Sequence, residues 1–188
     1  MASQPKPPDG FIYTPDIIDE EAESALVERI SELRLKPFEF QGYEAKRRVI
    51  SYGWHYNYAG YKLEKVDELP EFLLPLRSRI ANIAGLSAAE FSHALVTEYT
   101  PGTPIGWHRD RGVFAEVAGV SLLSACNFRF RRKAGAGWER YTCHLEPRSA
   151  YIMRGPSRTE WEHSIPEVDE LRYSITFRTM RPKANGSP

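Results

Sequence analysis

Apolar residues recur at helical spacing in two segments of the first half of the chain. The first segment follows Asp19, and its apolar positions are Ala22, Leu26, Ile30 and Leu33. Offsets of four, eight and eleven residues place these side chains on one face of a helix. Asp19 can cap the first turn, and the acidic residues that follow it suit the positive end of the helix dipole.

A second amphipathic helix is predicted after Pro70. Its apolar face is formed by Leu73, Leu76, Ile80 and Ile83. Pro75 fits the first turn or would kink the helix, and Gly85 is the expected stop because glycine readily adopts the left-handed conformation. Each helix has one apolar face that must pack against another part of the protein.

From Phe91 onward, short apolar runs alternate with turn residues. The runs are Ala94–Tyr99, Val117–Leu123, Asn127–Arg132, Trp138–Leu145, Ser149–Met153 and Arg172–Thr179. Short strands at this spacing predict a sandwich or barrel. The aromatic segment Arg47–Tyr61 also predicts strands or a hairpin. Helices that precede most of the strands indicate an α+β fold, with the N-terminal helices packed on one sheet.

The last predicted strand has one polar and one apolar face. Its polar side chains are Arg172, Ser174, Thr176 and Arg178, and the apolar ones are Tyr173, Ile175 and Phe177. The early helices can cover the apolar face, so the polar face would point into the barrel. Arginines inside a barrel are costly unless an anion meets them. The alternative is that both lie at a rim in water or pair with carboxylates.

Composition fits a folded protein and excludes several classes. Apolar residues make up 41% of the chain and charged residues 27%. Two cysteines without a CxxC motif indicate neither a disulfide framework nor a cysteine-based zinc site. No apolar run approaches the ~18 residues of a membrane span, and residues 1–9 lack the apolar segment of a secretory signal. We therefore expect a soluble cytoplasmic protein (nucleoid-associated if bacterial), not secreted and without a membrane partner.

Positive charge is concentrated in residues 127–158, which carry eight basic and two acidic residues. Over the whole chain, 25 basic residues balance 25 acidic ones, which excludes a strong global field. Arg129, Arg131, Arg132 and Lys133 can still meet a phosphate backbone if they lie on one face. The alternative is that they form the solvated side of a hairpin, since alternation alone places Arg129 and Arg131 outward.

The sharpest local motif is Trp107-His108-Arg109-Asp110. On a strand, His108 and Asp110 share a face and can take adjacent positions on one metal ion. His163 is the candidate third ligand. Two histidines and one carboxylate leave three octahedral positions open, which suits a non-haem Fe(II) oxygenase. Alone, the His-x-Asp motif is weak, because most instances are surface residues, and a single histidine is more often structural.

The arginines of the last strand strengthen this interpretation. Arg172 and Arg178 follow His163 by nine and fifteen residues. If the strand His163–Ser164 and the strand Arg172–Arg178 are neighbours, both guanidinium groups lie near the metal. The planar fork of arginine matches the distal carboxylate of a dicarboxylate that chelates iron. The predicted inward arginines would then have their anion.

These spaced elements resemble the AlkB family of Fe(II)/2-oxoglutarate-dependent dioxygenases. The resemblance rests on HxD, a later histidine and a closing R-x-x-x-x-x-R, with Leu95-Val96-Thr97-Glu98-Tyr99 before the HxD. It covers roughly Gly10 to Arg181 and implies a double-stranded β-helix (jelly-roll) core. It also implies one domain over residues 10–181, flexible tails at 1–9 and 182–188, and a substrate-covering lid near 41–61.

The resemblance implies roles for individual residues. Fe(II) would be bound by His108, Asp110 and His163. The 2-oxoglutarate site would comprise Arg172, Arg178, Tyr99, Thr97 and Ser174, with O2 as second co-substrate. Arg172 and Tyr99 would meet the far carboxylate, and Arg178 would lie near the carboxylate that chelates iron. Thr97 and Ser174 depart from the asparagines usual in the family, so co-substrate binding is expected but weakened.

A further departure concerns the substrate. Nucleobase demethylases of this family carry an acidic residue within two positions of the metal aspartate, where this chain has Arg111 and Gly112. The lid aromatics Tyr52, Trp54, Tyr56 and Tyr58 have even spacing and would share a face on which a flipped base could stack. The alternative is that they pack in the core. The predicted substrate-facing set is Arg48, Tyr52, Trp54, Tyr56, Arg109 and Arg111.

The leading hypothesis is an oxidative demethylase of N-methylated bases in nucleic acid, acting in repair of alkylation damage. Hydroxylation of the methyl group would give a hemiaminal that loses formaldehyde. Alkylated DNA or RNA is then the expected partner, with no partner protein and a monomeric chain. The alternative is hydroxylation or demethylation of a protein side chain or small molecule, which Arg111 and Gly112 favour. A non-enzymatic binding module is disfavoured, because the metal set and both arginines are present.

Overall fold

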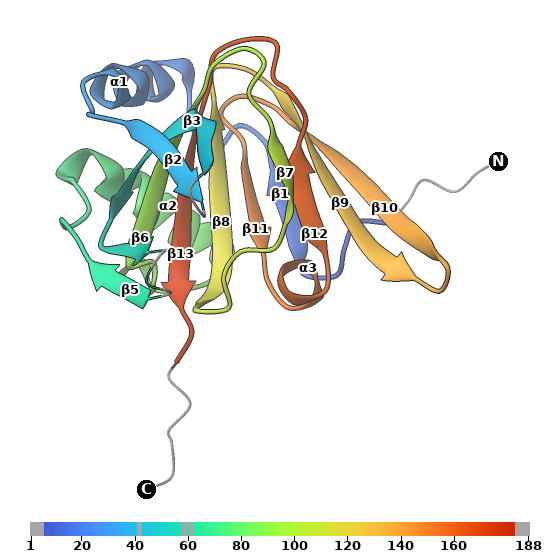
Figure 1. Cartoon of the computed structure of the whole chain (residues 1–188). Helices are drawn as coiled ribbons and strands as arrows, with labels where there is room; N and C mark the ends of the chain where they lie inside the picture. Colours follow the sequence, from blue (N-terminus) through green and yellow to red (C-terminus); the bar gives the residue numbers. More distant parts are fainter. Residues whose placement is uncertain (1–5, 41–42, 58–59, 61, 183–188) are drawn as a thin grey trace, which may run out of the picture.

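A seven-stranded antiparallel sheet is the framework of the computed structural model, which describes residues 6–40, 43–57, 60 and 62–182. Its strands follow the order β1-β11-β8-β13-β6-β3-β2 (Figure 1). Their bounds are β1 (Phe11–Thr14), β2 (Lys36–Phe40), β3 (Tyr43–Tyr52), β6 (His93–Tyr99), β8 (Phe114–Leu122), β11 (Ala150–Met153) and β13 (Arg172–Met180). Strand β13 therefore lies in the middle of this large sheet.

A smaller sheet faces the large one and has the order β10-β9-β12-β7. Its strands are β7 (Ile105–His108), β9 (Cys126–Ala134), β10 (Gly137–Leu145) and β12 (Glu162–Ile165). From β6 onward the chain alternates between the sheets, and only the β9–β10 hairpin stays within one. This interleaving defines a double-stranded β-helix, so the predicted α+β jelly-roll class is confirmed. A separate two-stranded sheet contains β4 (Trp54–Asn57) and β5 (Lys62–Lys65).

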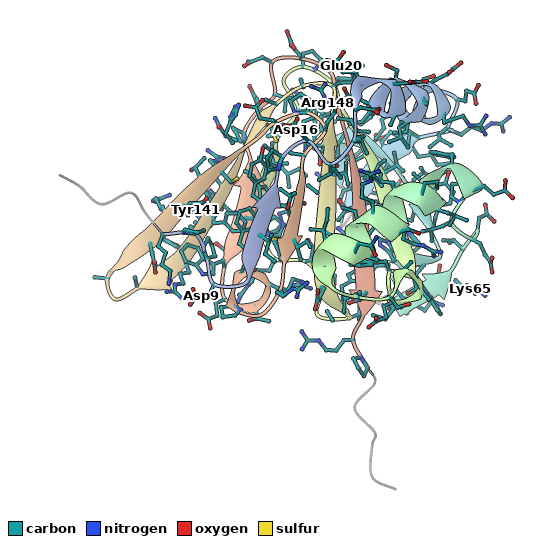
Figure 2. The ribbon with its side chains drawn as sticks, turned by 180° about the vertical axis from the view of Figure 1, so that it is seen from behind. Asp9, Asp16, Glu20, Lys65, Tyr141 and Arg148 are labelled. Atoms are coloured by element: carbon teal, nitrogen blue, oxygen red, sulfur yellow. The ribbon has the colours of Figure 1, made fainter. Side chains whose placement is uncertain are left out.

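Two helices cover the outer face of the large sheet, as the view from behind shows (Figure 2). Helix α1 (Glu20–Ser31) begins after Asp19, whose carboxylate accepts a hydrogen bond from the backbone of Ala22 at 2.8 Å. Helix α2 (Leu74–Ala84) carries Pro75 in its first turn and ends at Gly85, whose φ is 69°. Three short helices complete the set: η1 (Glu71–Leu73), η2 (Ala88–Glu90) and α3 (Pro156–Thr159).

The residues of β13 divide between an apolar core and the polar space between the sheets, as their alternation predicts. Tyr173, Ile175 and Phe177 are buried in the cluster between the large sheet and the helices, with Leu26 and Ile80. The other face of β13 points between the sheets. One end of that space is filled by aromatic side chains, among them Phe128, Phe130 and Trp161. The remaining space is polar and contains the candidate site.

The strand of His163 is not a neighbour of β13 within one sheet, which was the condition considered for bringing both arginines near the metal. Strand β12 pairs with β7 and β9, so His163 lies on the small sheet, and the arginines of β13 reach it from the facing sheet. Residues 1–5 and 183–188 of the predicted tails lie outside the described residues, as do 41–42, 58–59 and 61 of the predicted lid. Within the described part, Pro8 and Asp9 accept backbone hydrogen bonds from Phe11 and Ser157.

Candidate active site

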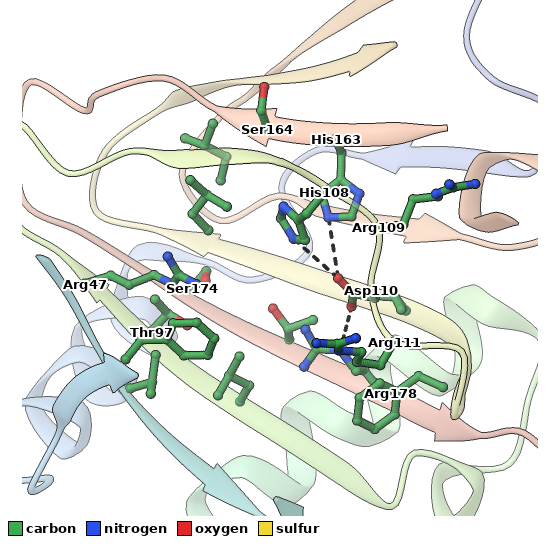
Figure 3. Close-up of a pocket in the computed structure, with 18 of the residues that line it drawn as sticks. Arg47, Thr97, His108, Arg109, Asp110, Arg111, His163, Ser164, Ser174 and Arg178 are labelled. Carbon is green, nitrogen blue, oxygen red and sulfur yellow. Dashed lines mark hydrogen bonds and ion pairs between the residues drawn. The ribbon is translucent and has the colours of Figure 1, made fainter. Parts of the chain in front are cut away.

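The structure brings His108, Asp110 and His163 together at the open edge of the small sheet. Strands β7 and β12 place the two histidines directly opposite each other, with ring centroids 4.3 Å apart. Asp110 does not lie on the strand as predicted, because β7 ends at His108. Its Oδ1 atom is nevertheless 3.6 Å from His108 Nε2 and 3.5 Å from His163 Nε2 (Figure 3). Three ligand atoms thus converge within 4.8 Å of one another.

Both imidazoles have a lone pair available for a metal ion. The Nδ1 atom of His108 lies 2.8 Å from the carbonyl oxygen of Gly106, which can only accept, so Nδ1 carries the proton and Nε2 is free to ligate. Burial, with His108 alongside, lowers the pKa of His163 from 6.5 to about 4, against the opposing effect of Asp110. His163 is therefore neutral at neutral pH, which is the form that binds metals.

Asp110 is kept ionised and fixed in direction by Arg178. The Nε atom of Arg178 donates to Asp110 Oδ2 at 2.7 Å. Burial by itself would raise the pKa of Asp110, but the adjacent Arg178 cation holds that pKa well below its ordinary range. One carboxylate oxygen is thereby engaged by the arginine, and the other faces the histidines.

The second inward arginine, Arg172, lies deeper between the sheets. Its residue is 1% exposed, and its Nε atom donates to the hydroxyl of Ser121 at 3.0 Å. Among the described residues, no group accepts a hydrogen bond from the buried Nη1 atom. The Tyr99 ring lies 4.9 Å from the guanidinium carbon, and its hydroxyl is 3.4 Å from the hydroxyl of Ser174. A buried cation with an unsatisfied donor fits a site for an anionic group.

A cavity of about 500 Å³ connects these groups. It is lined by all three residues of the metal cluster, by all five of the predicted 2-oxoglutarate set, and by Arg109, Arg111 and Tyr56 of the predicted substrate set. Ser121 was missed by the sequence analysis because a single serine in an apolar strand carries no distinguishing pattern. Ser121 lies opposite Ser174 in the pairing of β8 with β13, and this register cannot be predicted from the sequence pattern.

Three predicted substrate residues do not line the cavity. Arg48 lies on the opposite face of β3, where it makes two hydrogen bonds of 2.7 and 2.9 Å with Glu98. Tyr52 is buried in the core under the helices, and the half-buried Trp54 pairs with Lys65 in the two-stranded sheet. The shared aromatic face fails at Gly53, whose φ of 75° ends β3 and redirects the chain. Tyr58 lies outside the described residues.

Four half-buried side chains that line the cavity are here called the rim residues: Tyr56 and Arg111 from the predicted set, together with Phe38 and Arg47. They form two cation–π pairs. The guanidinium carbon of Arg47 is 3.9 Å from the Phe38 ring centroid, and that of Arg111 is 5.1 Å from the centroid of Tyr56. Such pairs place aromatic surface and positive charge side by side at the cavity.

The loop that carries Asp110 is hydrogen-bonded to a buried residue of α3 that the sequence pattern did not indicate. Arg158 in α3 is 5% exposed, and its Nη2 atom donates to the carbonyls of Arg111 at 2.6 Å and Phe114 at 3.0 Å. Arg109 donates to the carbonyl of Thr159 at 3.0 Å. Both contacts tie the loop after β7 to α3, which fixes the position of the metal aspartate.

Comparisons with known proteins agree with this geometry. The profile of the 2OG-Fe(II) oxygenase superfamily matches residues 10–178. The alkylated DNA repair protein ALKBH8 homolog of Arabidopsis thaliana is 27% identical over 73% of this chain and 47% of its own length. The DNA oxidative demethylase ALKBH2 of Mus musculus is 30% identical over 69% of this chain and 59% of its own length. This chain thus spans about half the length of the curated relatives it matches.

The fold is similar to that of a solved structure. The structure of OsALKBH1 superposes with a TM-score of 0.69 at 14% identity, covering 94% of this chain and 100% of that one. The chain therefore belongs to the 2OG-Fe(II) oxygenase superfamily, the class that the jelly roll and the His-Asp-His cluster define. As a member of that superfamily it is a dioxygenase that uses Fe(II), 2-oxoglutarate and O2, and within the superfamily it is similar to AlkB homologues.

The residues present fit these groups. His108, Asp110 and His163 would hold Fe(II) through two neutral imidazoles and one carboxylate, a donor set typical of non-haem iron oxygenases. The unsatisfied Nη1 donor of Arg172 would donate to the distal carboxylate of 2-oxoglutarate.

Within the described residues, every helix is too short or too polar to span a bilayer.

Proposed function

We propose that this dioxygenase removes N-methyl groups from bases in nucleic acid. The similarity to proteins named for alkylated-DNA repair and DNA oxidative demethylation supports this activity. The observation that carries it is the rim: two aromatic rings, each paired with an arginine, at a cavity that reaches the metal cluster. A flipped nucleotide needs an aromatic surface for its base and positive charge for its phosphates.

The charge of the cavity favours uncharged bases. Among the described lining residues, Asp110 is the only carboxylate, and Arg178 already engages it. Five arginines line the same cavity: Arg47, Arg109, Arg111, Arg172 and Arg178. A methylated base that carries a positive charge would meet like charges and find no free carboxylate. A base that stays neutral after methylation avoids this repulsion, and its phosphates are attracted.

Each group of residues has a defined task in turnover. When bound, Fe(II) with 2-oxoglutarate and O2 supplies the oxidising power that hydroxylates the methyl C–H bond. Arg172 and the Tyr99 hydroxyl would orient the co-substrate, while Arg178 keeps Asp110 ionised and aligned. Phe128 and Tyr151 add apolar surface to the lining of the cavity. The hydroxylated methyl group then leaves as formaldehyde and restores the base.

Formaldehyde release tests the proposal. The iron-loaded enzyme is given single-stranded oligonucleotides that differ only in one residue: N3-methylthymine, which is neutral, N1-methyladenine, which is cationic, or an unmethylated base. A peptide with methylated lysine is the fourth substrate. We expect release from the neutral base above all others. Release from the peptide alone would replace the proposal with a protein-directed activity. Preference for the cationic base would refute the charge argument while leaving nucleic-acid demethylation intact.

A further inference from the structure

The outer face of the small sheet carries a row of stacked cations and tryptophans. Side chains alternate between the two faces of a strand, so Phe128 and Phe130 of β9 point into the core while Arg129, Arg131 and Lys133 point outward. On β12, Figure 3 shows Ser164 pointing away from the side on which His163 faces the cluster. The row therefore lies on the face of the small sheet opposite His163, and it meets the cavity only at the edge strand β7, where Trp107 also lines the cavity.

Five side chains form this outer row, here called the Trp–cation row: Trp107, Arg129, Arg131, Lys133 and Trp138. The guanidinium carbon of Arg131 lies 4.5 Å from the Trp107 ring centroid and 4.3 Å from that of Trp138. Arg129 lies 5.2 Å from Trp107, and Lys133 Nζ lies 4.4 Å from Trp138. The rings thus hold three cations at fixed positions.

The chemistry of the row suits phosphate groups. A guanidinium stacked on an indole keeps its in-plane N–H donors available, because the ring occupies only its flat face. Arg140 on β10 lies opposite Arg131 in the register and adds a fourth, exposed cation. Glu162 is the only carboxylate on this face of the four strands, and it pairs with the Arg131 Nε atom at 2.7 Å. The face keeps a net positive charge.

The row begins beside the cavity and leads away from it. Trp107 immediately precedes His108 and lines the cavity, whereas Trp138 is on the far edge strand and is 37% exposed. From β7 across β12 and β9 to β10 there are three interstrand steps, or about 14 Å. A strand whose target base enters the cavity could continue along this face.

We propose that the Trp–cation row binds the phosphodiester backbone of the nucleic-acid strand that carries the target base. This inference rests on the proposed function, since it assigns a second contact surface to the same substrate. The tryptophans act by holding the cations in place, which lowers the entropy lost on binding. The alternative, that the row only stiffens the small sheet, predicts no effect on nucleic-acid affinity when exposed cations are removed.

Binding of an unmodified fluorescent single strand of about twelve nucleotides, followed across salt concentrations, tests this inference. The double variant Lys133→Gln/Arg140→Gln should bind about tenfold more weakly at low salt, with the slope of log affinity against log salt reduced by about 1.4, that is ~0.7 per lost contact. Trp138→Leu should weaken binding with a smaller change of slope, because it removes no charge. The matched control, Arg29→Gln/Arg34→Gln, removes two exposed cations, one in the last turn of α1 and one just after it, and should bind like wild type.

The outcomes separate the two proposals. A wild-type slope in Lys133→Gln/Arg140→Gln, or equal binding of a polyglutamate peptide, would overturn the role of the row. Demethylation of methylated oligonucleotides without any effect of row variants would leave the proposed function standing alone. Loss of oligonucleotide binding in the row variants, with no formaldehyde from any methylated base, would keep the row and reject the demethylase. Thermal unfolding of each variant verifies that the lost affinity does not reflect lost structure.

Discussion

The two sets of residues that line the cavity differ in how the fold holds them. Arg172, Tyr99 and Ser174 are buried and lie on adjacent central strands, where each backbone is paired on both sides. The rim residues are half-buried and come from an edge strand, from β3, from the separate two-stranded sheet and from a loop. The difference indicates that the candidate co-substrate residues are built into the barrel, while the candidate substrate residues lie on elements that can vary without disturbing it.

The largest effect is expected when the contact between Asp110 and Arg178, which both line the cavity, is broken. Asp110→Ala removes a candidate metal ligand and leaves Arg178, whose side chain is only 11% exposed, without its 2.7 Å partner. Turnover should be lost, and the metal-free protein should be about 3–5 kcal/mol less stable, as when one partner of a buried ion pair is removed. Unfolding in urea and iron binding measure the two effects. Wild-type iron affinity in this variant would remove Asp110 from the metal site.

The stability of the metal-free enzyme should depend on pH through His163. Its pKa is lowered from 6.5 to about 4 in the folded protein, so between these values the unfolded chain binds a proton that the folded chain does not. The free energy of unfolding should therefore fall as the pH drops through this window, by up to about 3 kcal/mol. Urea unfolding of wild type and His163→Gln tests this: the variant should show a flatter profile. Parallel profiles would mean that other groups dominate.

Arg172→Lys should affect the buried set and leave the rim intact. Lysine keeps the charge but cannot make the planar, two-point contact with a carboxylate. The KM for 2-oxoglutarate should rise roughly 10- to 100-fold, the equivalent of one charge-assisted hydrogen bond, while oligonucleotide binding stays unchanged. Arg34→Lys, at an exposed position, is the matched control. An unchanged KM would point to Arg178 as the cation for the distal carboxylate.

The smallest effect is expected at the rim. Tyr56→Ala should weaken binding of a methylated oligonucleotide by about 1–3 kcal/mol, the usual contribution of one stacked base. Conversion of 2-oxoglutarate without substrate should persist, because the metal cluster is untouched. Tyr52→Ala is the contrasting variant. This ring lies in the core under the helices, so the free energy of unfolding should fall instead. If Tyr56→Ala abolishes both demethylation and the conversion of 2-oxoglutarate without substrate, the ring supports the fold, as Tyr52 does, and is not a separate substrate contact.

The spacing of polar and apolar residues predicted which side chains are buried wherever a strand or helix runs without interruption. The faces of β13 and the two helices followed from spacing, because burial of one face sorts residues with a period of 2 or 3.6. Between Arg47 and Tyr58 the same reasoning failed, because Gly53 changes the direction of the chain within an otherwise regular pattern. The sheet to which β12 belongs was also not predictable, because periodicity specifies faces and not strand neighbours.

The pairing of β7 with β12 has a consequence for how the enzyme assembles. His108 and His163 face each other across this pair, yet β8, β9, β10 and β11 lie between them along the chain. Closing such a long loop must precede the contact, and non-local pairing of this kind slows folding. A ribosome-bound chain cannot bring both histidines to one ion until β12 has emerged. The complete candidate iron site therefore forms late in assembly, only after β12 has paired with β7.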